Sequence, residues 1–273
     1  MYQYMLAAGM LLLCASTSPA QSSSTLIGGR AGGLAYSSSC LDDEWSIFNN
    51  IGGLAKIENT TVSFAYDAQP SFKPFNRIAA VFALPLHFGV AGAGVFRFGD
   101  RLYSEQILAL GFSNEFGLAS LGLKVNYIQY KAEGFGTKGV FTLSFGGIAK
   151  ITEKISVGAH VINLNQPNLS TVEHEKLTTI LIVGGAVKLS SQTFITTELE
   201  KDLIYPVKWK SGVEYQPYKK FILRTGFQVN PAAAFFGFGF RPKKFKLDYS
   251  YQHNFSLGSR HQATVGYLFD ARK

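Results

Sequence analysis

A strict two-residue alternation in the last strand-forming segment, residues 260–269, constrains the fold of this chain more than any other feature. One face of this segment carries Ala263, Val265, Tyr267 and Phe269, and the other carries Gln262, Thr264, Gly266 and Leu268. An amphipathic strand with aromatic residues on its apolar face, close to the C-terminus, is typical of the strand that closes a transmembrane β-barrel. Charged residues make up 16% of the chain, against about 25% in soluble domains, which fits this interpretation. The segment therefore predicts an all-β membrane protein in which Tyr267 and Phe269 face lipid.

The same alternation recurs along the chain and predicts fourteen strands, an even number as bacterial barrels require. The predicted strands are 59–66, 77–88, 89–98, 104–114, 118–130, 139–150, 154–163, 177–189, 193–201, 207–215, 220–229, 233–241, 244–252 and 260–269. Together they predict a 14-stranded antiparallel barrel over residues 58–269.

The most apolar segment, residues 78–96, is long enough to span a membrane as a helix. Pro85 and the three glycines that follow it oppose a helix, and the residues alternate on either side of Phe88-Gly89. The alternation is imperfect, because the second face is less polar than expected. We predict a tight hairpin rather than a helix here.

The predicted connections are short on one side of the barrel and longer on the other. The short turns fall at Gly89, 116–117, 152–153, 190–192, 217–218 and 242–243, and the longer loops at 67–76, 131–138 and 163–176. Short periplasmic turns and longer outer loops are the pattern of outer-membrane barrels. The longest loop is still modest, so the sequence predicts a sparse outer face.

Charged residues of both signs fall on the face opposite the apolar one in neighbouring strands. This predicted lumen charge network consists of Glu198, Glu200, Lys208, Lys210, Glu214, Arg224, Lys246 and Asp248. Either these residues form a structural salt-bridge network or they line a polar permeation path. Mixed charge neutralises a lumen rather than selecting an ion, so the structural network is favoured.

The N-terminal part of the chain does not alternate and divides into two regions. Residues 1–20 have the apolar core and the small residues of a secretory signal peptide, with Ser18-Pro19-Ala20 at the cleavage position. Residues 21–57 are predicted to form a plug in the lumen, and residues 270–273 a short C-terminal tail. Cys40 is then the one cysteine of the mature chain, and is interpreted as a small loop residue without a redox role.

The plug region carries a recognisable order of residues. It has a Gly/Ala/Arg-rich opening, an acidic pair, and an aromatic-Asn segment before Gly-Leu-Ala. The residues of this predicted hatch motif are Arg30, Asp42, Asp43, Trp45, Asn50 and Gly53. The region resembles the hatch of the barrel family of the fatty-acid transporter FadL, and more closely its Bacteroidota branch of PorV and PorQ. Short motifs such as Gly212-Val213-Glu214-Tyr215 and Leu247-Asp248-Tyr249 extend the resemblance over most of the mature chain.

This resemblance implies a plugged barrel in the outer membrane of a Gram-negative bacterium of the Bacteroidota. The short loops favour a non-enzymatic subunit of an envelope complex, either for type IX secretion or for outer-membrane protein assembly. The alternative is a FadL-like transporter of hydrophobic compounds with a mobile hatch. The implied partners are membrane lipid, other outer-membrane proteins and a hydrophobic ligand that binds near Trp45 and Phe48. The net charge of +8 fits contact with anionic lipid headgroups, and no nucleic-acid-binding module is recognisable.

Enzymatic and metal chemistry find little support in the sequence. A phospholipase needs a Ser/His pair within hydrogen-bond reach, and the nearest candidate is His253 with Ser256. The histidines lack metal-ligand spacing, so no cofactor or metal is expected. Asp42-Asp43-Glu44 is interpreted as a solvated acidic cluster rather than a Ca²⁺ site.

Overall fold

The structure, a computed structural model, describes residues 24–169, 176–202, 205–255 and 258–269. The predicted signal peptide, residues 1–20, and the predicted tail, residues 270–273, lie outside these residues. Among the described residues, no helix is long and apolar enough to cross a membrane.

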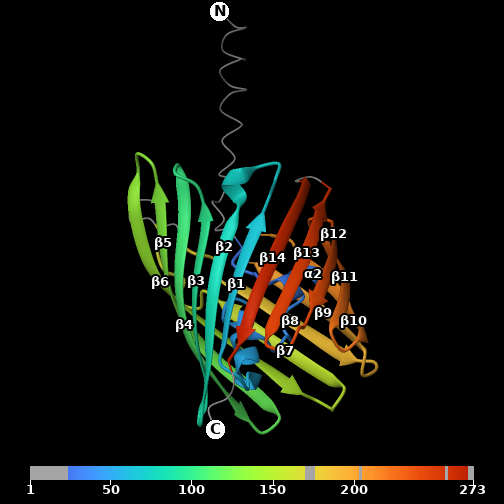
Figure 1. The fold of residues 1–273 in the computed structure, drawn as a ribbon. Coiled ribbons are helices and arrows are strands. Elements are labelled where there is room, and N and C mark those ends of the chain that lie inside the picture. The colour runs from blue at the N-terminus through green and yellow to red at the C-terminus, as the bar shows by residue number, and fades with distance from the viewer. Residues whose placement is uncertain (1–23, 170–175, 203–204, 256–257, 270–273) are drawn as a thin grey trace, which may run out of the picture.

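Antiparallel strands form one closed barrel in which every strand pairs with its neighbours in sequence and β1 pairs with β14 (Figure 1). The strands are β1 (Thr61–Ala68), β2 (Arg77–Leu86), β3 (Gly89–Gly99), β4 (Tyr103–Phe116), β5 (Ala119–Ala132), β6 (Gly136–Lys150), β7 (Ile155–Ile162), β8 (Ile180–Lys188), β9 (Thr193–Asp202), β10 (Lys208–Tyr218), β11 (Phe221–Val229), β12 (Ala233–Phe240), β13 (Phe245–Asn254) and β14 (Gly258–Leu268). The predicted fold class, a 14-stranded antiparallel transmembrane β-barrel, is confirmed.

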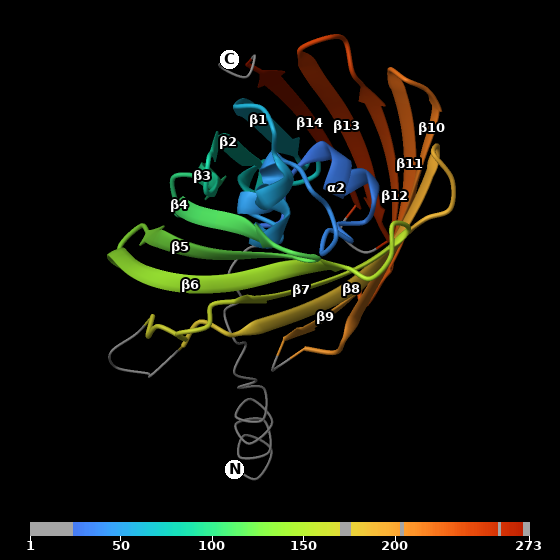
Figure 2. The ribbon, with the colours of Figure 1, turned by 90° about the horizontal axis from the view of Figure 1, so that it is seen from below.

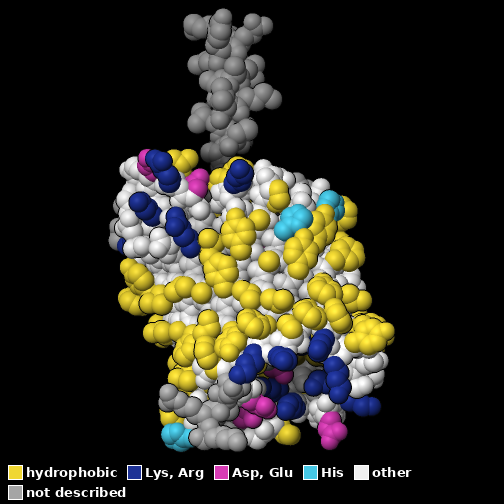
Figure 3. Space-filling model, viewed as in Figure 1, with side chains coloured by type: hydrophobic (Ala, Val, Ile, Leu, Met, Phe, Trp, Pro, Cys, Tyr) yellow, Lys and Arg dark blue, Asp and Glu magenta, His cyan; other side chains and the backbone are white. Residues whose placement is uncertain are grey.

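Side chains alternate between the lumen and the outer surface along each strand, because successive residues of a strand point to opposite faces. In β1 the burial alternates at every residue from Thr61 to Asp67, and Phe64 is 46% exposed. In the closing strand Gln262 and Thr264 are buried, whereas Val265 is exposed. The outward side chains form a broad hydrophobic band across the middle of the wall, with Lys and Arg above and below it (Figure 3). Such a band is the surface that a bilayer covers.

The predicted hairpin at residues 78–96 is present as β2 and β3. Their register runs without interruption from Arg77↔Phe98 to Leu86↔Gly89, and His87 and Phe88 form the turn. Gly89 has a φ of 141°, which a residue with a side chain rarely adopts, so glycine is needed where the chain reverses.

Two predicted connections differ from the structure. Residues 131–138, predicted as a long loop, are mostly strand, since β5 and β6 stay paired up to Ala132↔Gly136. The turn predicted at 217–218 lies at residues 219–220, because a β-bulge between Tyr215 and Tyr218 lets β10 continue past Pro217. A bulge is one of the few places where a strand accepts a proline, which donates no ladder hydrogen bond.

Residues 24–57, named the luminal segment here, lie inside the barrel (Figure 2). The segment contains a short α-helix, α2 (Gly29–Gly33), and two 3-10 helices, η2 (Glu44–Ile47) and η3 (Ile51–Lys56). A further 3-10 helix, η4 (Lys73–Phe75), lies in the loop between β1 and β2. The luminal segment therefore occupies space that the strands enclose.

Candidate functional site

The luminal segment runs lengthwise through the barrel, from the end with the longer loops to the end with the short turns. At the loop end, Arg77 at the start of β2 donates to the carbonyl oxygens of Ser24 and Leu26, at 2.9 and 3.2 Å. At the turn end, the hydroxyl of Ser113, near the end of β4, donates to the Gly52 carbonyl oxygen at 3.3 Å. The segment therefore extends along most of the length of the lumen.

Two glycines of the luminal segment are required by close contacts. A Cβ on Gly53 would lie 2.1 Å from the Leu41 carbonyl oxygen, and a Cβ on Gly52 would lie 2.6 Å from the Cα of Gly147 in β6. Asn50, just before them, donates from its side chain to the carbonyl oxygens of Ser39 and Gly147, at 2.6 and 3.0 Å. Of the predicted hatch motif, Asn50 and Gly53 thus bring the segment against itself and against the wall.

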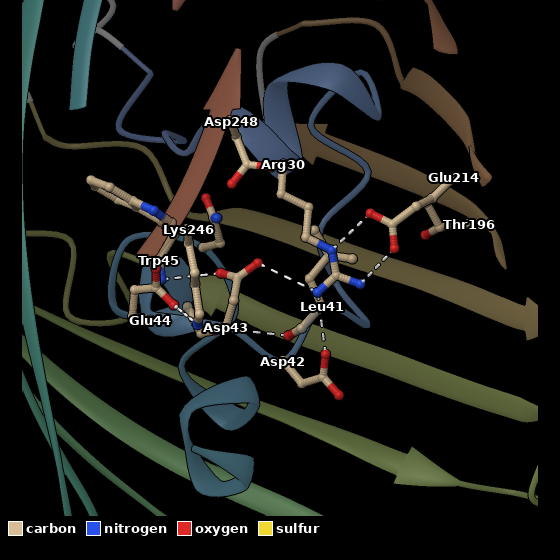
Figure 4. A network of polar contacts seen from close by, with 12 residues as sticks. Arg30, Leu41, Asp42, Asp43, Glu44, Trp45, Thr196, Glu214, Lys246 and Asp248 are labelled. Carbon is tan, nitrogen blue, oxygen red and sulfur yellow. Dashed lines mark hydrogen bonds and ion pairs between the residues drawn. The ribbon is translucent and has the colours of Figure 1, made fainter. Parts of the chain in front are cut away.

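Arg30 of the hatch motif joins the segment to the wall and to itself. Its Nε and Nη2 donate to the two carboxylate oxygens of Glu214 in β10, both at 3.1 Å, a bidentate geometry (Figure 4). Its Nη1 lies 3.3 Å from Asp42 and 3.6 Å from Asp43. Burial lowers the pKa of Arg30, but the three carboxylates outweigh burial and raise it well above its usual value.

The acidic run at 42–44 was predicted to be a solvated cluster, but only Asp42 of the three residues is exposed. Glu44 is buried: its carboxylate accepts from Ser63 Oγ at 2.6 Å and pairs with Lys246 Nζ at 2.8 Å (Figure 4). Burial raises the pKa of Asp43 to about 6, with Glu44 adding to the rise and Arg30 opposing it. For Asp42, attraction to Arg30 and Lys56 outweighs burial and lowers the pKa. The run is partnered because cations approach it from distant parts of the chain.

Glu198 in β9 is the wall's second anchor for the segment and is 1% exposed. One of its carboxylate oxygens accepts the N–H groups of Ser38 and Ser39, each at 2.8 Å, and the Ser39 hydroxyl. The other oxygen pairs with Lys210 Nζ at 3.1 Å. Lys210 also reaches Glu200 at 2.5 Å, and Lys208 lies 2.8 Å from Glu200.

The remaining network residues surround Arg224 in β11. Its Nε lies 2.6 Å from Glu214, and its Nη1 lies 2.7 Å from Asp248 in β13. Arg241, which the sequence prediction missed, also pairs with Asp248, at 2.8 Å. The structure thus brings together seven of the eight predicted network residues in two groups of ion pairs on the wall, while Lys246 turns to the luminal segment instead.

The opposite side of the lumen contains one continuous apolar cluster. Buried inward-facing residues of β1 to β6 form one cluster with the luminal segment: Ala65, Ala79, Val81, Ala83, Val90, Phe96, Ile107, Ala109, Ile128 and Val140. From the segment, Trp45, Ile47, Phe48, Ile51 and Leu54 pack against this wall. Leu177, between β7 and β8, extends the cluster toward the loop end. The lumen therefore has an apolar cluster on the β1 to β6 side and groups of ion pairs on the β9 to β13 side.

A polar cavity of about 210 Å³ opens at the loop end, above the luminal segment. Its lining includes Arg77, Arg260 and Tyr36. Arg77 pairs with Asp67 in β1 and donates to the Tyr36 hydroxyl at 3.1 Å, and Arg260 lies 3.4 Å from Asp67. Sequence reasoning missed this group, although Arg77 and Asp67 flank the predicted loop at 67–76 and their proximity could have been inferred.

The remaining residues that the sequence analysis considered are Cys40 and the His253/Ser256 pair. Cys40 is buried, its thiol lies 3.6 and 3.7 Å from the carbonyl oxygens of Ser156 and Gly184, and burial raises its pKa to about 12. Ser256 of the phospholipase hypothesis lies outside the described residues, and His253 is exposed. Among the described residues, no group of three or more His, Cys, Asp or Glu side chains is arranged to hold a metal ion.

Fold and site together define a transmembrane β-barrel whose lumen is filled by an N-terminal segment of its own chain. No protein-family model and no curated protein matches the sequence.

Solved structures nevertheless share the fold. The CymD monoaromatic hydrocarbon channel is similar at a TM-score of 0.69 and 11% identity, over 92% of this chain and 99% of that chain. The toluene transporter TodX of P. putida is similar at a TM-score of 0.68 and 11% identity, over 92% and 100% of the two chains. The toluene transporter TbuX of Ralstonia pickettii is similar at 0.66 and 12%, over 91% and 99%. At these identities the comparison shows a common fold.

Proposed function

We propose that this barrel is an outer-membrane channel for hydrophobic compounds and that the luminal segment is its movable hatch. The observation that carries the proposal is the apolar cluster in the lumen. A water-filled porin presents polar side chains to its interior. Here inward-facing residues of β1 to β6 form a continuous apolar cluster, which contacts the segment through Ile47, Phe48 and Ile51.

The solved structures with this fold favour the transporter alternative over the envelope-complex subunit that the short loops suggested. The channels described above carry monoaromatic hydrocarbons or toluene by their names, and none of them is named as a secretion subunit. No observation described above supports the predicted PorV/PorQ-like role in secretion or an origin in the Bacteroidota.

The route requires the hatch to move. Phe48 and Ile51 fill the space against the apolar wall and are 1% and 2% exposed, so a ligand must displace them. The contacts on this side are non-directional van der Waals contacts. A hydrophobic ligand can make contacts of the same type with the wall after the segment has moved away. For the segment to move as a whole, the charged contacts of Arg30 and Glu198 on the other side of the lumen must also break.

A disulfide between the segment and the wall tests this proposal. Ser37 Oγ and Thr196 Oγ1 lie 3.1 Å apart, so cysteines at both positions, in a Cys40→Ala background, are placed to cross-link. Uptake of radiolabelled toluene is measured in Gram-negative cells that produce the protein. We expect the oxidised Ser37→Cys/Thr196→Cys variant to lose at least fivefold in rate and to recover on reduction, while the matched Ser37→Cys single variant is insensitive to reductant.

The outcomes separate the two parts of the proposal. If the cross-linked and reduced forms take up toluene equally fast, the hatch does not have to move. If the reduced form is no faster than cells without the protein, the barrel is not a channel for this class of compound.

A further inference from the structure

Five polar side chains gather on the lumen faces of β5, β6 and β7, away from the ion pairs that anchor the luminal segment. They are Lys124, Asn126, Thr142, Ser144 and His160, and each is at most 5% exposed. Within the described part of the chain, Ser144 Oγ, Asn126 Oδ1 and both ring nitrogens of His160 have no hydrogen-bond partner. Buried polar groups in proteins are nearly always paired, so such a concentration of unpaired atoms indicates a ligand site.

The strand register brings these side chains to one place. Lys124 is directly opposite Ser144, and Asn126 is directly opposite Thr142 and donates to its hydroxyl at 3.0 Å. His160 is opposite Gly146, which makes it a diagonal neighbour of Ser144. Directly opposite Cβ atoms lie about 5 Å apart and diagonal ones about 7–8 Å. The Lys124, Ser144 and His160 side chains therefore converge on one small volume, which we name the β5–β7 site.

The charge of this site is not balanced by the protein residues that the structure describes. The lumen lysines Lys210 and Lys246 each lie within 3.1 Å of a carboxylate. Lys124, by contrast, makes no ion pair or hydrogen bond within the described residues, although it is 3% exposed. An unpaired buried ammonium is costly, so a negatively charged partner is strongly favoured there.

Glu200, whose carboxylate acts on His160, is already paired with Lys208 and Lys210. Gly111 is opposite Lys124 in β4, and Gly122 is two residues before it; a Cβ on either would lie within 3.0 Å of Ile51. On the loop side of the site, the next inward residues are Ile128 and Val140. The site is thus a polar patch between Ile51 of the luminal segment and the apolar wall residues Ile128 and Val140.

We infer that the β5–β7 site binds an anion that presents acceptor oxygens, such as a carboxylate or a phosphate. Lysine contributes three N–H donors and no acceptor, and the Ser144 hydroxyl and the His160 ring supply further donors. The anion comes either as a small free ion or as the acidic end of an amphiphilic molecule whose apolar part lies along Ile128 and Val140. The site does not depend on the proposed transport, since a resident anion would balance Lys124 in a closed barrel too.

Calorimetric titration of the purified protein in an uncharged detergent tests this inference. The probes are sodium formate, sodium phosphate, sodium decanoate and decanol. We expect saturable binding of at least one of the three anions and a loss of at least tenfold in affinity in Lys124→Met. Lys131→Met, an exposed lysine on the same strand, is the matched control and binds as the wild type does.

The probes also identify the source of the anion, and Ser144→Ala provides a second variant. Formate or phosphate that binds as tightly as decanoate indicates a free ion, whereas decanoate at least tenfold tighter than both formate and decanol indicates an amphiphile. Ser144→Ala should weaken the same anion severalfold without altering the strand content. The inference is overturned if the wild type binds none of the anions, or if both variants bind them as tightly as the wild type.

Discussion

Replacing Glu198 with Gln removes the charge of one buried anchor while keeping its shape. Glu198 accepts three hydrogen bonds from Ser38 and Ser39 and forms an ion pair with Lys210 at 3.1 Å. A glutamine has one acceptor oxygen for these donors, and its NH₂ group then points at the Lys210 ammonium. We expect the luminal segment to detach more often from β9 while the barrel stays closed, because the strand ladder does not use this carboxylate.

The size of the effect follows from the burial of the pair. Breaking a buried ion pair by changing one partner costs about 3–5 kcal/mol. Since 1.36 kcal/mol corresponds to a factor of ten, opening of the segment should become about 160 to 5,000 times more frequent. Glu200 still reaches Lys210 at 2.5 Å, so the lower end of this range is expected.

Hydrogen exchange read by mass spectrometry measures this opening peptide by peptide. Peptides from the luminal segment should exchange at least 100-fold faster in Glu198→Gln than in the wild type, by the same estimate. Peptides from β1 to β14 should not change, and Glu115→Gln, an exposed residue at the end of β4, is the matched control. Unchanged exchange around Ser38 would refute the anchoring role, and equal acceleration in the strands would show that the segment and the barrel open as one unit.

Three further predictions concern the segment and the outer wall. The pKa of Asp43 rises from 3.8 to about 6 on folding, so the folded state is stabilised while this carboxyl is neutral. Stability, and with it the melting temperature, should therefore fall as the pH rises between these values. Asp43→Asn, which keeps the side-chain cap on the Trp45 N–H, should make this fall smaller. Gly53→Ala, whose Cβ would lie 2.1 Å from the Leu41 carbonyl oxygen, should lower the free energy of unfolding by about 1–3 kcal/mol and expose the segment to protease. Gly185→Ala, whose Cβ would lie 3.7 Å from the Ser156 carbonyl oxygen, should do neither. Phe64→Arg, in the middle of the lipid-facing side of β1, should lower the free energy of unfolding by about 2–4 kcal/mol, as measured by urea unfolding in liposomes. Phe135→Arg, in an exposed turn, should change it little.

The barrel itself could be predicted from the sequence because one physical constraint acts on every strand. Each strand separates lipid from lumen, so its side chains must alternate, and the period-2 pattern indicates both the strand and its faces. Trp209 and Lys210 show this well: the first is 45% exposed on the outer wall and the second is buried in the lumen.

Strand ends were less predictable because hydrophobicity does not determine where pairing stops. Residues 131–138 were predicted to be a loop, yet Lys131 and Lys138 remain in the ladder. Backbone hydrogen bonds there need no apolar side chain, and Gly134 and Gly136, at φ values of 80° and 89°, allow a shorter turn.

Part of the candidate site could also be predicted, because alternation determines which charged side chains of a strand face the lumen. Alternation places Glu214 and Arg224 on the lumen face of adjacent strands, and register makes them partners. Alternation says nothing about a segment that has no strand period. The contact of Arg30 with Glu214 joins residues 184 positions apart, and the pairing of Glu44 with Lys246 spans 202. The acidic run therefore resembled a solvated cluster until the path of the luminal segment was known.

The alternation is least regular in residues 78–96, and this irregularity indicates what lies on each side of the barrel wall there. In residues 78–96 both faces are apolar, which made the sequence pattern ambiguous between a helix and a hairpin. The structure explains this pattern: Ile78 and Phe82 face outward and are 42% and 40% exposed, whereas Ala79 and Val81 face inward and pack in the cluster with the luminal segment. A strand that lines a water-filled pore has polar residues on its inward face, so two apolar faces indicate a strand with lipid on one side and an apolar plug or ligand on the other. If the barrel is the channel proposed above, this departure from alternation identifies the wall that a hydrophobic compound would contact.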